Sequence, residues 1–453
     1  MSSDWSVVSI DDIKAAQHGS IAIGPFGSRM KSDCYVSEGV RVVRGTNLTG
    51  GRSFSGAFVF ITPEKADELN SANLHPTDLV FPHRGAIGEV GLVPNDGERY
   101  VLSSSLMKLT CAPNRAHPDF IYYFFRTEGG RFELLKNSSQ VGTPGIGQPL
   151  TSLKQIKLKL PPVDEQRAIA AVLRALDDRI ALLRETNATL EAIAQALFKS
   201  WFVDFDPVRA KSQGLAPAGM DDATAALFPE AFEESALGPV PARWECIDLA
   251  ALTQRFQGSI QTGPFGSQLH ASDYVDHGVP VVMPKDIVNR RVSTDSVARV
   301  CRADVDRLSR HKLQAGDIVF SRRGDVERHA LITEREVGWL CGTGCLLLRP
   351  GKDWHGYGFL SMLLDAARAR TWLVQHAVGA TMPNLNTGIL GSVPVVLPPS
   401  QLLAAFEDIA SATEEQRSRN ASMAETLATL RDTLLPRLIS GQLRLPEAEA
   451  ALP

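Results

Sequence analysis

Apolar residues between positions 160 and 206 recur at spacings that alternate between four and three. The seam consists of Ile169, Leu173, Leu176, Ile180, Leu183, Leu190, Ala194 and Leu197, and Asn187 interrupts it. A repeat of this kind, sustained over about four heptads, is typical of a coiled coil rather than of the wider apolar stripe of a globular helix. Asp164 fits the N-cap after Pro161-Pro162, and Pro207 lies beyond the end. The pattern predicts one helix of roughly 40 residues, about 60 Å long.

The chain contains an internal repeat. GPFGS at 24–28 recurs at 263–267, and DLVF at 78–81 recurs as DIVF at 317–320, both at an offset of 239. A second long helix is predicted from Ser400, as N-cap, to Gly441, as the C′ residue, with a poorer apolar seam. Within each copy, short β-rich runs alternate with Gly/Pro turns, and residues 118–136 of the first copy read as a helix. The fold class is therefore α+β.

The repeat divides the chain into five predicted segments. They are a first domain (1–160), a long central helix (161–206), a linker (207–242), a second domain (243–396) and a distal long helix (397–445). The linker is rich in Pro, Ala, Asp and Glu, and its composition predicts a segment that wraps the surface. Two equivalent halves predict a pseudo-twofold arrangement in which the two helices pair antiparallel.

Composition excludes several classes of protein. The 453 residues are 44% hydrophobic, and no apolar run is long enough for a membrane helix. The N-terminus lacks the pattern of a signal peptide, so we expect a cytoplasmic protein. The six cysteines are scattered, which favours reduced structural thiols over a metal site. Net charge is −4, but residues 1–160 carry 17 bases against 15 acids and residues 243–395 carry 18 against 15. This bias fits either a DNA-binding surface or chance.

Four stretches together resemble the specificity subunit of type I restriction-modification systems. They are the repeated GPFGS, the helix entry KLPPVDEQRAIAAVL, the helix end ALFKSWFVDFDPVRAK and the late segment LLPRLISGQLRL. The resemblance implies two target recognition domains, joined by helices, that read a bipartite and asymmetric sequence in double-stranded DNA. It also implies two adenine-N6 methyltransferase subunits using S-adenosylmethionine, and ATP- and Mg-dependent restriction subunits, while this chain binds no cofactor. The second helix departs from the pattern, with Gln401-Leu402 in place of Glu165-Gln166.

Candidate DNA contacts follow the repeated motifs. The GPFGS glycines and serines could approach phosphates, and the residues after them differ between the copies, as expected if they read different bases. This set comprises Ser28, Arg29 and Lys31 in the first copy and Ser267, Gln268 and His270 in the second. The alternative is a structural turn that tucks Phe26 and Phe265 into the core.

Further candidates lie at strand ends and in amide-rich loops. Buried strands should deliver His83, Arg84, Arg322 and Arg323 to a tip, where the alternative is an Arg bound to a neighbouring Asp. Arg41, Arg44, Asn47 and Lys285 come next, with solvated surface charge as the alternative for each. The loops 141–151 and 378–387 offer Gln148, Asn384 and Asn386, which could read bases or only form turns before a helix.

Two features of the first long helix have open interpretations. Asn187 fits a residue that fixes helix register at some cost in stability, or a contact to a partner. Trp201 and Phe202, beside Lys199, fit a protein interface or packing against the first domain.

Catalytic signatures are missing from the sequence. It contains no GxxxxGK[ST] motif, no HExxH motif and no Asn/Asp-Pro-Pro-Tyr/Phe motif of adenine methylation. We therefore interpret the chain as non-catalytic. A scaffold that spaces two protein-binding modules, and an enzyme of unrecognised type, remain as alternatives.

Overall fold

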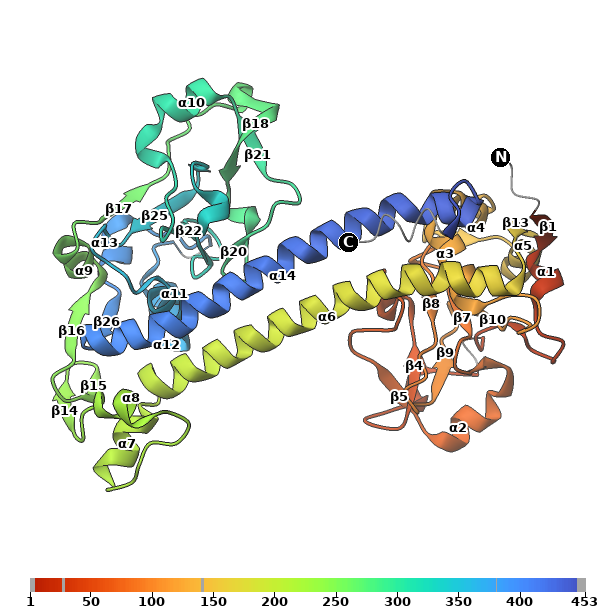
Figure 1. Ribbon diagram of the computed structural model, residues 1–453, viewed down its shortest axis with the longest axis horizontal. Coiled ribbons are helices and arrows are strands. Elements are labelled where there is room, and N and C mark those ends of the chain that lie inside the picture. Colours follow the sequence, from red (N-terminus) through yellow and green to blue (C-terminus); the bar gives the residue numbers. More distant parts are fainter. Residues whose placement is uncertain (1–4, 27–28, 140–141, 380, 446–453) are drawn as a thin grey trace. The chain divides into compact units, whose positions relative to one another are not determined.

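The computed structural model describes residues 5–26, 29–139, 142–379 and 381–445 (Figure 1). Its chain divides into two compact units. The first unit comprises residues 1–185 and 420–453, and the second comprises residues 186–419. Each unit therefore combines a globular part with a segment of each long helix.

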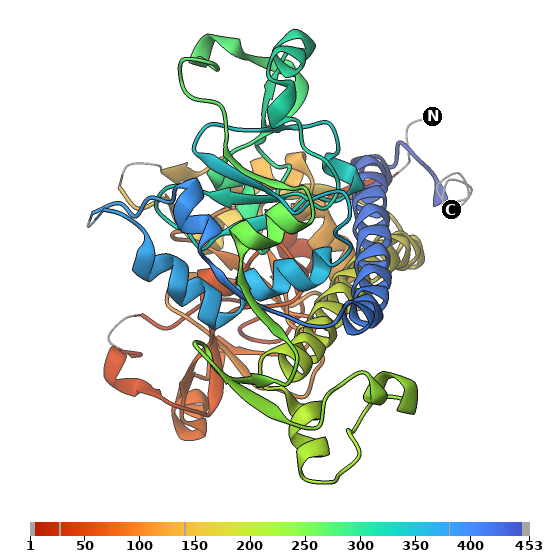
Figure 2. The ribbon, with the colours of Figure 1, turned by 90° about the vertical axis from the view of Figure 1, so that its left-hand side faces the viewer.

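The two predicted long helices are present. Helix α6 spans Val163–Phe202 and helix α14 spans Ser400–Ser440. Asp164 lies inside the first turn of α6 rather than at the N-cap, whereas Gly441 follows α14 with a φ of 74°, as expected for a C′ residue. Within each unit the segments of α6 and α14 lie side by side (Figures 1 and 2).

Apolar residues of α6 and α14 pack the helix segments together in each unit. In the first unit, Leu173 and Leu176 share a core with Leu427 and Leu434. In the second unit, Phe198 and Phe202 pack on Phe406, with ring centroids 5.9 and 5.0 Å apart. Asn187 meets Arg417 in the same unit, so α6 and α14 run antiparallel there.

The globular part of the first unit contains two main sheets. The four-stranded sheet has the order β2-β10-β7-β8 and the five-stranded sheet has the order β3-β5-β4-β9-β6. The strands of the four-stranded sheet are β2 (Ile21–Ile23), β7 (Leu79–Pro82), β8 (Gly91–Leu92) and β10 (Leu106–Leu109). Those of the five-stranded sheet are β3 (Tyr35–Val36), β4 (Val40–Val43), β5 (Val59–Ile61), β6 (Asn73–Leu74) and β9 (Tyr100–Leu102). Two short pairs add β1 (Ser6–Ser9) on β13 (Lys157–Leu160) and β11 (Ser138–Ser139) on β12 (Gly145–Ile146). The helices are α1 (Ile10–Ile13), α2 (Pro63–Glu68), α3 (Pro118–Arg126), α4 (Glu128–Leu135) and α5 (Pro149–Gln155).

The second unit repeats the four-stranded sheet of the first. Its four-stranded sheet has the order β17-β25-β22-β23, which matches the order in the first unit strand for strand. These strands are β17 (Ser259–Thr262), β22 (Ile318–Ser321), β23 (His329–Leu331) and β25 (Cys345–Arg349). A three-stranded sheet has the order β21 (Ala298–Val300), β18 (Tyr274–Val282), β24 (Leu340–Cys341). Two strand pairs are β19 (Ile287–Val288) with β20 (Arg291–Val292) and β16 (Glu245–Asp248) with β26 (Pro394–Leu397). The helices are α9 (Leu249–Arg255), α10 (Arg302–Arg307), α11 (Tyr357–Asp365), α12 (Ala367–His376) and α13 (Thr387–Gly391).

The segment 207–242 is more structured than its composition predicts. It carries nearly all of α7 (Asp206–Ser212), then α8 (Asp222–Ala226) and a hairpin of β14 (Phe232–Ser235) and β15 (Gly238–Pro241). Val208 and Phe228 are buried in the core of the second unit. The segment therefore belongs to that unit, because two apolar anchors hold it there.

Two further expectations need correction. The predicted helix 118–136 is two helices, since Thr127 is extended and accepts a hydrogen bond from the N–H of Gly130 as the N-cap of α4. Trp201 and Phe202 are buried, and they pack in the second unit rather than on the first domain or at an open surface. Phe228, which stands edge-on to Trp201 with ring centroids 5.3 Å apart, provides part of that packing.

Across the described residues, no helix is long and apolar enough to cross a membrane. All six cysteines are free.

Candidate nucleic-acid interface

Two of the predicted loops leave the first unit at the same edge of its four-stranded sheet. Strands β2 and β7 both run antiparallel to β10, and Met107 of β10 pairs with Ile23 on one side and with Phe81 on the other. Strands that flank a common antiparallel neighbour run in the same direction, so they end at the same edge. The GPFGS loop and the His83-Arg84-Gly85 tip therefore emerge next to each other.

A third loop joins them. Arg84 pairs with Gly145 in an isolated β-bridge, and the N–H of Gly85 donates to the carbonyl oxygen of Pro144 at 2.9 Å. These backbone contacts bring the amide-rich loop that precedes α5 to the same edge. The sequence predicted each loop separately, and the structure brings the three together.

The second unit repeats the arrangement. Leu346 of β25 pairs with Thr262 and Phe320, the N–H of Gly324 donates to Pro383 O at 3.0 Å, and Arg323 bridges to Asn384. We call this feature the loop edge. It is formed in the first unit by residues 24–26, 29–31, 83–85 and 142–147, and in the second by residues 263–270, 321–324 and 381–386.

The loop edge presents arginines without acidic partners. Arg84 and Arg323 are exposed, and within the described part of the chain no carboxylate forms an ion pair with either. Arg322 is half-buried, and its Nε is buried without a hydrogen-bond partner. The alternative of an Arg held by a neighbouring Asp does not apply to these side chains. A guanidinium that is unneutralised at a strand end suits a phosphate or a guanine edge.

The other candidates of the GPFGS loops differ in their availability. Arg29 and Lys31 are exposed, and Arg29 donates to the backbone oxygen of Glu68 at 3.3 Å. Gln268 accepts a hydrogen bond from the N–H of Phe265 at 3.1 Å, and His270 lies with its Nδ1 3.7 Å from Asp273. Ser267 is exposed, and Ser28 lies outside the described residues.

Both amide-rich loops end at a helix, as the structural alternative predicted. Gln148 occupies the N-cap position of α5 in a left-handed conformation, with φ of 46°, and its side chain is exposed. Asn386 caps α13, because its Oδ1 accepts the N–H of Ile389 at 2.8 Å. Asn384 is half-buried, and its Oδ1 is buried without a hydrogen-bond partner. Of the three, Gln148 therefore presents its amide most openly to a ligand.

Two candidates are unsuited to DNA contact. Asn47 is fully buried, and its Oδ1 accepts from Arg44 N at 2.9 Å while its Nδ2 donates to Ser55 O at 2.9 Å. His83 is buried, its Nε2 lies 3.1 Å from Ser104 O, and burial lowers its pKa. Burial and these hydrogen bonds keep both side chains away from a ligand at the surface. The sequence held a signal for Asn47, since the equivalent position of the second copy is Asp286, and both residues suit a cap.

Arg41, Arg44 and Lys285 all have partners inside their own units. Arg41 donates to Tyr100 Oη at 3.2 Å and lies 5.6 Å from the ring centroid of Phe58. Arg44 donates to Ala57 O at 3.2 Å, and Lys285 donates to Ser296 O at 2.9 Å. The structure thus gives these three side chains a part in shaping loops.

The GPFGS phenylalanines are not tucked into the core. Phe26 is 71% exposed and Phe265 is 53% exposed, so the structural alternative for this motif is wrong. Met30 and Leu269 instead take the buried positions behind each loop. Sequence reasoning missed this because an apolar residue in a turn reads by default as a core anchor.

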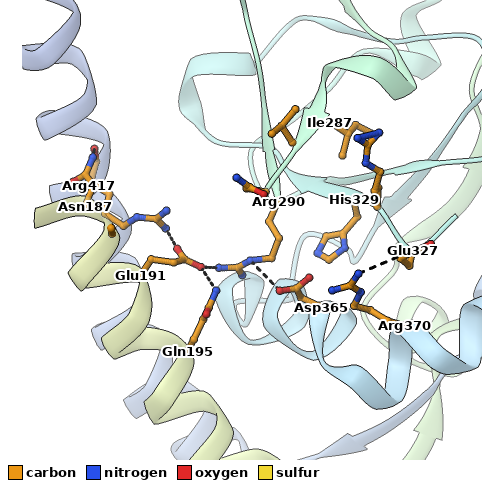
Figure 3. Close-up of a pocket in the computed structure, with 14 residues that line it drawn as sticks. Asn187, Glu191, Gln195, Ile287, Arg290, Glu327, His329, Asp365, Arg370 and Arg417 are labelled. Carbon is orange, nitrogen blue, oxygen red and sulfur yellow. Dashed lines mark hydrogen bonds and ion pairs between the residues drawn. The ribbon is translucent and has the colours of Figure 1, made fainter. Parts of the chain in front are cut away.

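A polar cavity of about 610 Å³ lies in the second unit between the globule and the helix segments (Figure 3). Its central group is Glu191 of α6, which forms ion pairs with Arg290 of the β19–β20 turn and with Arg417 of α14. Arg290 also lies 3.7 Å from Asp365. Burial raises the pKa of Glu191, but the two arginines outweigh it and the pKa is lowered overall.

The cavity is better explained as an attachment than as a ligand site. Asn289 and Arg290 both have positive φ, 48° and 61°, in the two-residue turn, and this turn aims the guanidinium of Arg290 at α6. Its acids and bases neutralise one another, which leaves little unmatched charge for a ligand. Within the described residues, no group of three or more His, Cys, Asp or Glu side chains is placed to hold a metal ion.

The sequence is similar to that of known specificity subunits. The model of the type I restriction modification DNA specificity domain matches residues 2–192. The chain is 26% identical over 408 residues to the type I restriction enzyme HindI specificity subunit of Haemophilus influenzae, covering 81% of this chain and 86% of that protein. It is 25% identical over 395 residues to the MjaIX specificity subunit of Methanocaldococcus jannaschii, covering 85% and 82%.

A solved structure shows the same fold. The S subunit of a type I restriction-modification system from M. genitalium superposes with a TM-score of 0.61 at 15% identity, covering 96% of both chains. The similarity therefore covers both α+β units and both long helices of this chain. In its N-terminal domain, in its relatives and in its fold, the chain is therefore similar to the specificity subunits of type I restriction-modification systems.

Proposed function

We propose that this chain recognises a bipartite, asymmetric sequence in double-stranded DNA, with the loop edge of each unit reading one part. The observation that carries the proposal is the gathering of three loops, with exposed and unpaired arginines, at the same sheet edge of both units. Loops held by a rigid sheet present side chains in a fixed geometry, as base recognition requires.

Differences between the two loop edges support different half-sites. Arg29 and Lys31 in the first unit correspond to Gln268 and His270 in the second. Arg pairs well with the O6 and N7 atoms of guanine and Gln with the N6 and N7 atoms of adenine, each good pair contributing about 1–3 kcal/mol of discrimination. Two readers with different side chains need not share a target, so one chain can read a sequence that is not a palindrome.

The long helices would space the readers and dock the partners. We expect two modification subunits and restriction subunits to bind this chain and to hold S-adenosylmethionine, ATP and Mg, with the methyl transfer and the cleavage in those partners. A complex that acts on chromosomal DNA works in the cytoplasm, and this location stays a prediction.

Adenine methylation provides the primary test. Cells that express the chain with its methyltransferase subunit should carry N6-methyladenine in one bipartite motif, mapped by single-molecule sequencing, and cells without the gene should lack it. The purified complex should bind a duplex with that motif more tightly than a scrambled duplex, and the affinity should fall with salt because phosphate contacts release counterions.

Two results would contradict the proposal. If methylation were unchanged by removing the gene and the complex did not distinguish the duplexes, a scaffold for protein modules would be the better reading. If the isolated chain transferred methyl groups from S-adenosylmethionine, its assignment as non-catalytic would be wrong.

A further inference from the structure

The exposed phenylalanine side chains of the two GPFGS loops belong to none of the hydrophobic cores of the described residues. Phe26 and Phe265 occupy equivalent positions, three residues beyond the last residues of β2 and β17, which are Ile23 and Thr262. Both rings are more than half exposed, although a Phe side chain gains most from full burial. An apolar ring kept in water at the same place in two units calls for a ligand.

Tightly packed backbone fixes the start of each loop. A Cβ on Gly24 would come within 1.8 Å of Ser103 O, and one on Gly263 within 2.1 Å of Gly342 O. Pro25 and Pro264 are buried beside these glycines. Each loop therefore starts from tightly packed backbone.

The far side of each loop is also anchored. The N–H of Arg29 donates to Phe26 O at 2.8 Å, and the N–H of Gln268 donates to Phe265 O at 2.8 Å. Met30 and Leu269 follow and are buried. Anchors on both sides of each phenylalanine lower the entropic cost of presenting the ring to a ligand.

The surroundings of the rings favour nucleic acid over protein as the occupant. Because Ile23 and Phe81 align on the same residue of β10, the loop of Phe26 leaves the sheet beside the tip that carries Arg84. The equivalent pairing of Thr262 and Phe320 on β25 puts the loop of Phe265 beside the tip that carries Arg323. An apolar ring next to unneutralised arginines matches a ligand that offers sugars, base faces and phosphates together.

The repeat also indicates what kind of contact the ring makes. The residues after the motif differ between the copies, whereas the phenylalanine is the same. A phenyl ring has no hydrogen-bond donor or acceptor with which to distinguish base edges. It suits a feature that every DNA sequence shares, such as a base face or a deoxyribose.

We propose that Phe26 and Phe265 are apolar DNA contacts, each packing against the sugars or base faces of its own half-site and adding affinity that does not depend on base identity. This inference rests on the proposed function and names a contact of the same site. It separates two tasks on one loop edge. The rings add affinity for any duplex, and the polar side chains around them discriminate between bases.

The test uses the complex of the full chain with its methyltransferase subunit, a duplex carrying the methylated motif and a scrambled duplex. Phe26→Ala and Phe265→Ala should each raise Kd by about 10-fold for both duplexes, a loss typical of one stacked aromatic. The dependence of log Kd on log salt should stay unchanged, because no phosphate contact is removed. The methylated motif should also stay the same.

Matched controls keep the result interpretable. Val7→Ala in the first unit and Leu215→Ala in the second remove side chains that are 63% and 60% exposed but lie outside the loop edge, and both should leave Kd unchanged. All variants should elute as the intact complex with an unaltered Tm. A Phe26→Trp variant adds tryptophan fluorescence, measured as the difference from the unsubstituted complex. Binding of the duplex should quench this added fluorescence.

Three outcomes would overturn the inference. They are unchanged Kd values in both Ala variants, a loss limited to one base position, and a loss of methyltransferase binding with normal DNA affinity in the complexes that remain. The last result would make the rings a protein contact. If the unsubstituted complex itself failed to prefer the motif, the proposed function would fail instead, and the two failures are thereby distinguished.

Discussion

Asn187 of α6 donates a hydrogen bond from Nδ2 to the main-chain oxygen of Arg417 on α14, at 2.9 Å. The contact lies within the second unit, at the one position that interrupts the heptad seam of α6. It supports the interpretation of Asn187 as a residue that fixes helix register. A polar group in a seam fixes register because only one alignment of the helices satisfies it.

Two substitutions at Asn187 should shift stability in opposite directions. Asn187→Leu should raise Tm, because an apolar residue packs better in a seam, at the expense of register. Asn187→Ala should lower the free energy of unfolding by about 1 kcal/mol, since it removes the hydrogen bond without adding apolar area. Thermal and urea unfolding of the complex measure both. If Asn187→Leu lowered Tm instead, the hydrogen bond of Asn187 would stabilise the protein more than the apolar packing of a leucine does.

Glu191 should be more important for stability than other acids of α6. Glu191→Ala would leave Arg290 and Arg417, both largely buried, without their shared partner, and removing one side of a buried ion pair costs about 3–5 kcal/mol. Glu185→Ala changes an exposed acid of the same helix and should stay within about 0.5 kcal/mol. Urea unfolding compares the two, and equal effects would contradict the role given to the cavity in Figure 3.

His329 should make the protein sensitive to mild acid. Burial lowers its pKa from 6.5 to about 4, so the folded protein keeps this side chain neutral. The unfolded chain takes up a proton first as pH falls below 6.5, and stability is therefore full above that pH and lost towards pH 4. Between pH 6.5 and 5 this group alone should remove about 1.5 kcal/mol.

Variants separate this histidine from the general effect of acid. His329→Gln should lower Tm at pH 7.5 but flatten its fall between pH 6.5 and 5, while His18→Gln changes an exposed side chain and should leave Tm at pH 7.5 unchanged. Differential scanning calorimetry at several pH values measures both. A parallel pair of curves for the parent and His329→Gln would exclude the proposed titration.

Arg323 should act on one half-site only. Arg323→Ala should weaken recognition of the half-site read by the second unit by about 1–3 kcal/mol if the guanidinium meets a base, and it should leave the other half-site unchanged. The Kd values for duplexes with single base changes measure this loss. Arg302→Ala, which removes an exposed arginine on α10, is the control. A uniform loss on all duplexes, with a smaller salt slope, would make Arg323 a phosphate contact.

Helix length should set the spacer between the half-sites. Inserting seven residues after Leu183 and seven after Asn420 keeps the heptad phase and adds about 10 Å to each helix, or roughly 3 base pairs of DNA. Methylation mapping should then find both half-sites unchanged and a spacer longer by about 2–3 base pairs. An active variant with the original spacer would mean that partner subunits or DNA bending set the distance.

Much of this architecture follows from local patterns. The heptads of α6 predict its extent, and the repeated GPFGS and DLVF motifs predict two equivalent units, because spacing and turn residues are local properties. The same motifs predicted the individual loops of the loop edge, but not that they lie together. Its assembly depends on backbone bridges such as Arg84 to Gly145, whose partners lie far apart in sequence.

What the sequence could not reveal concerns which atoms are already in use. In the sequence, Asn47 and Arg84 are both polar residues in turns. In the structure, the side chain of Asn47 is hydrogen-bonded to the surrounding backbone, whereas Arg84 is exposed and forms no ion pair with a described carboxylate. Trp201 reads as a surface aromatic until Phe228, 27 positions along the chain, is seen to pack against it. Tertiary contacts decide each of these cases, and periodicity carries no information about them.

The division of the two long helices has a consequence for synthesis on the ribosome. Residues 186–419 form one unbroken segment, so all of the second unit has been made once Arg419 is added. The first unit begins earlier but cannot be completed then, because Leu427, Leu434 and Leu438 belong to its core. The unit that is translated first should therefore be the last to fold, with its apolar helix face uncovered until the final turns of α14 emerge.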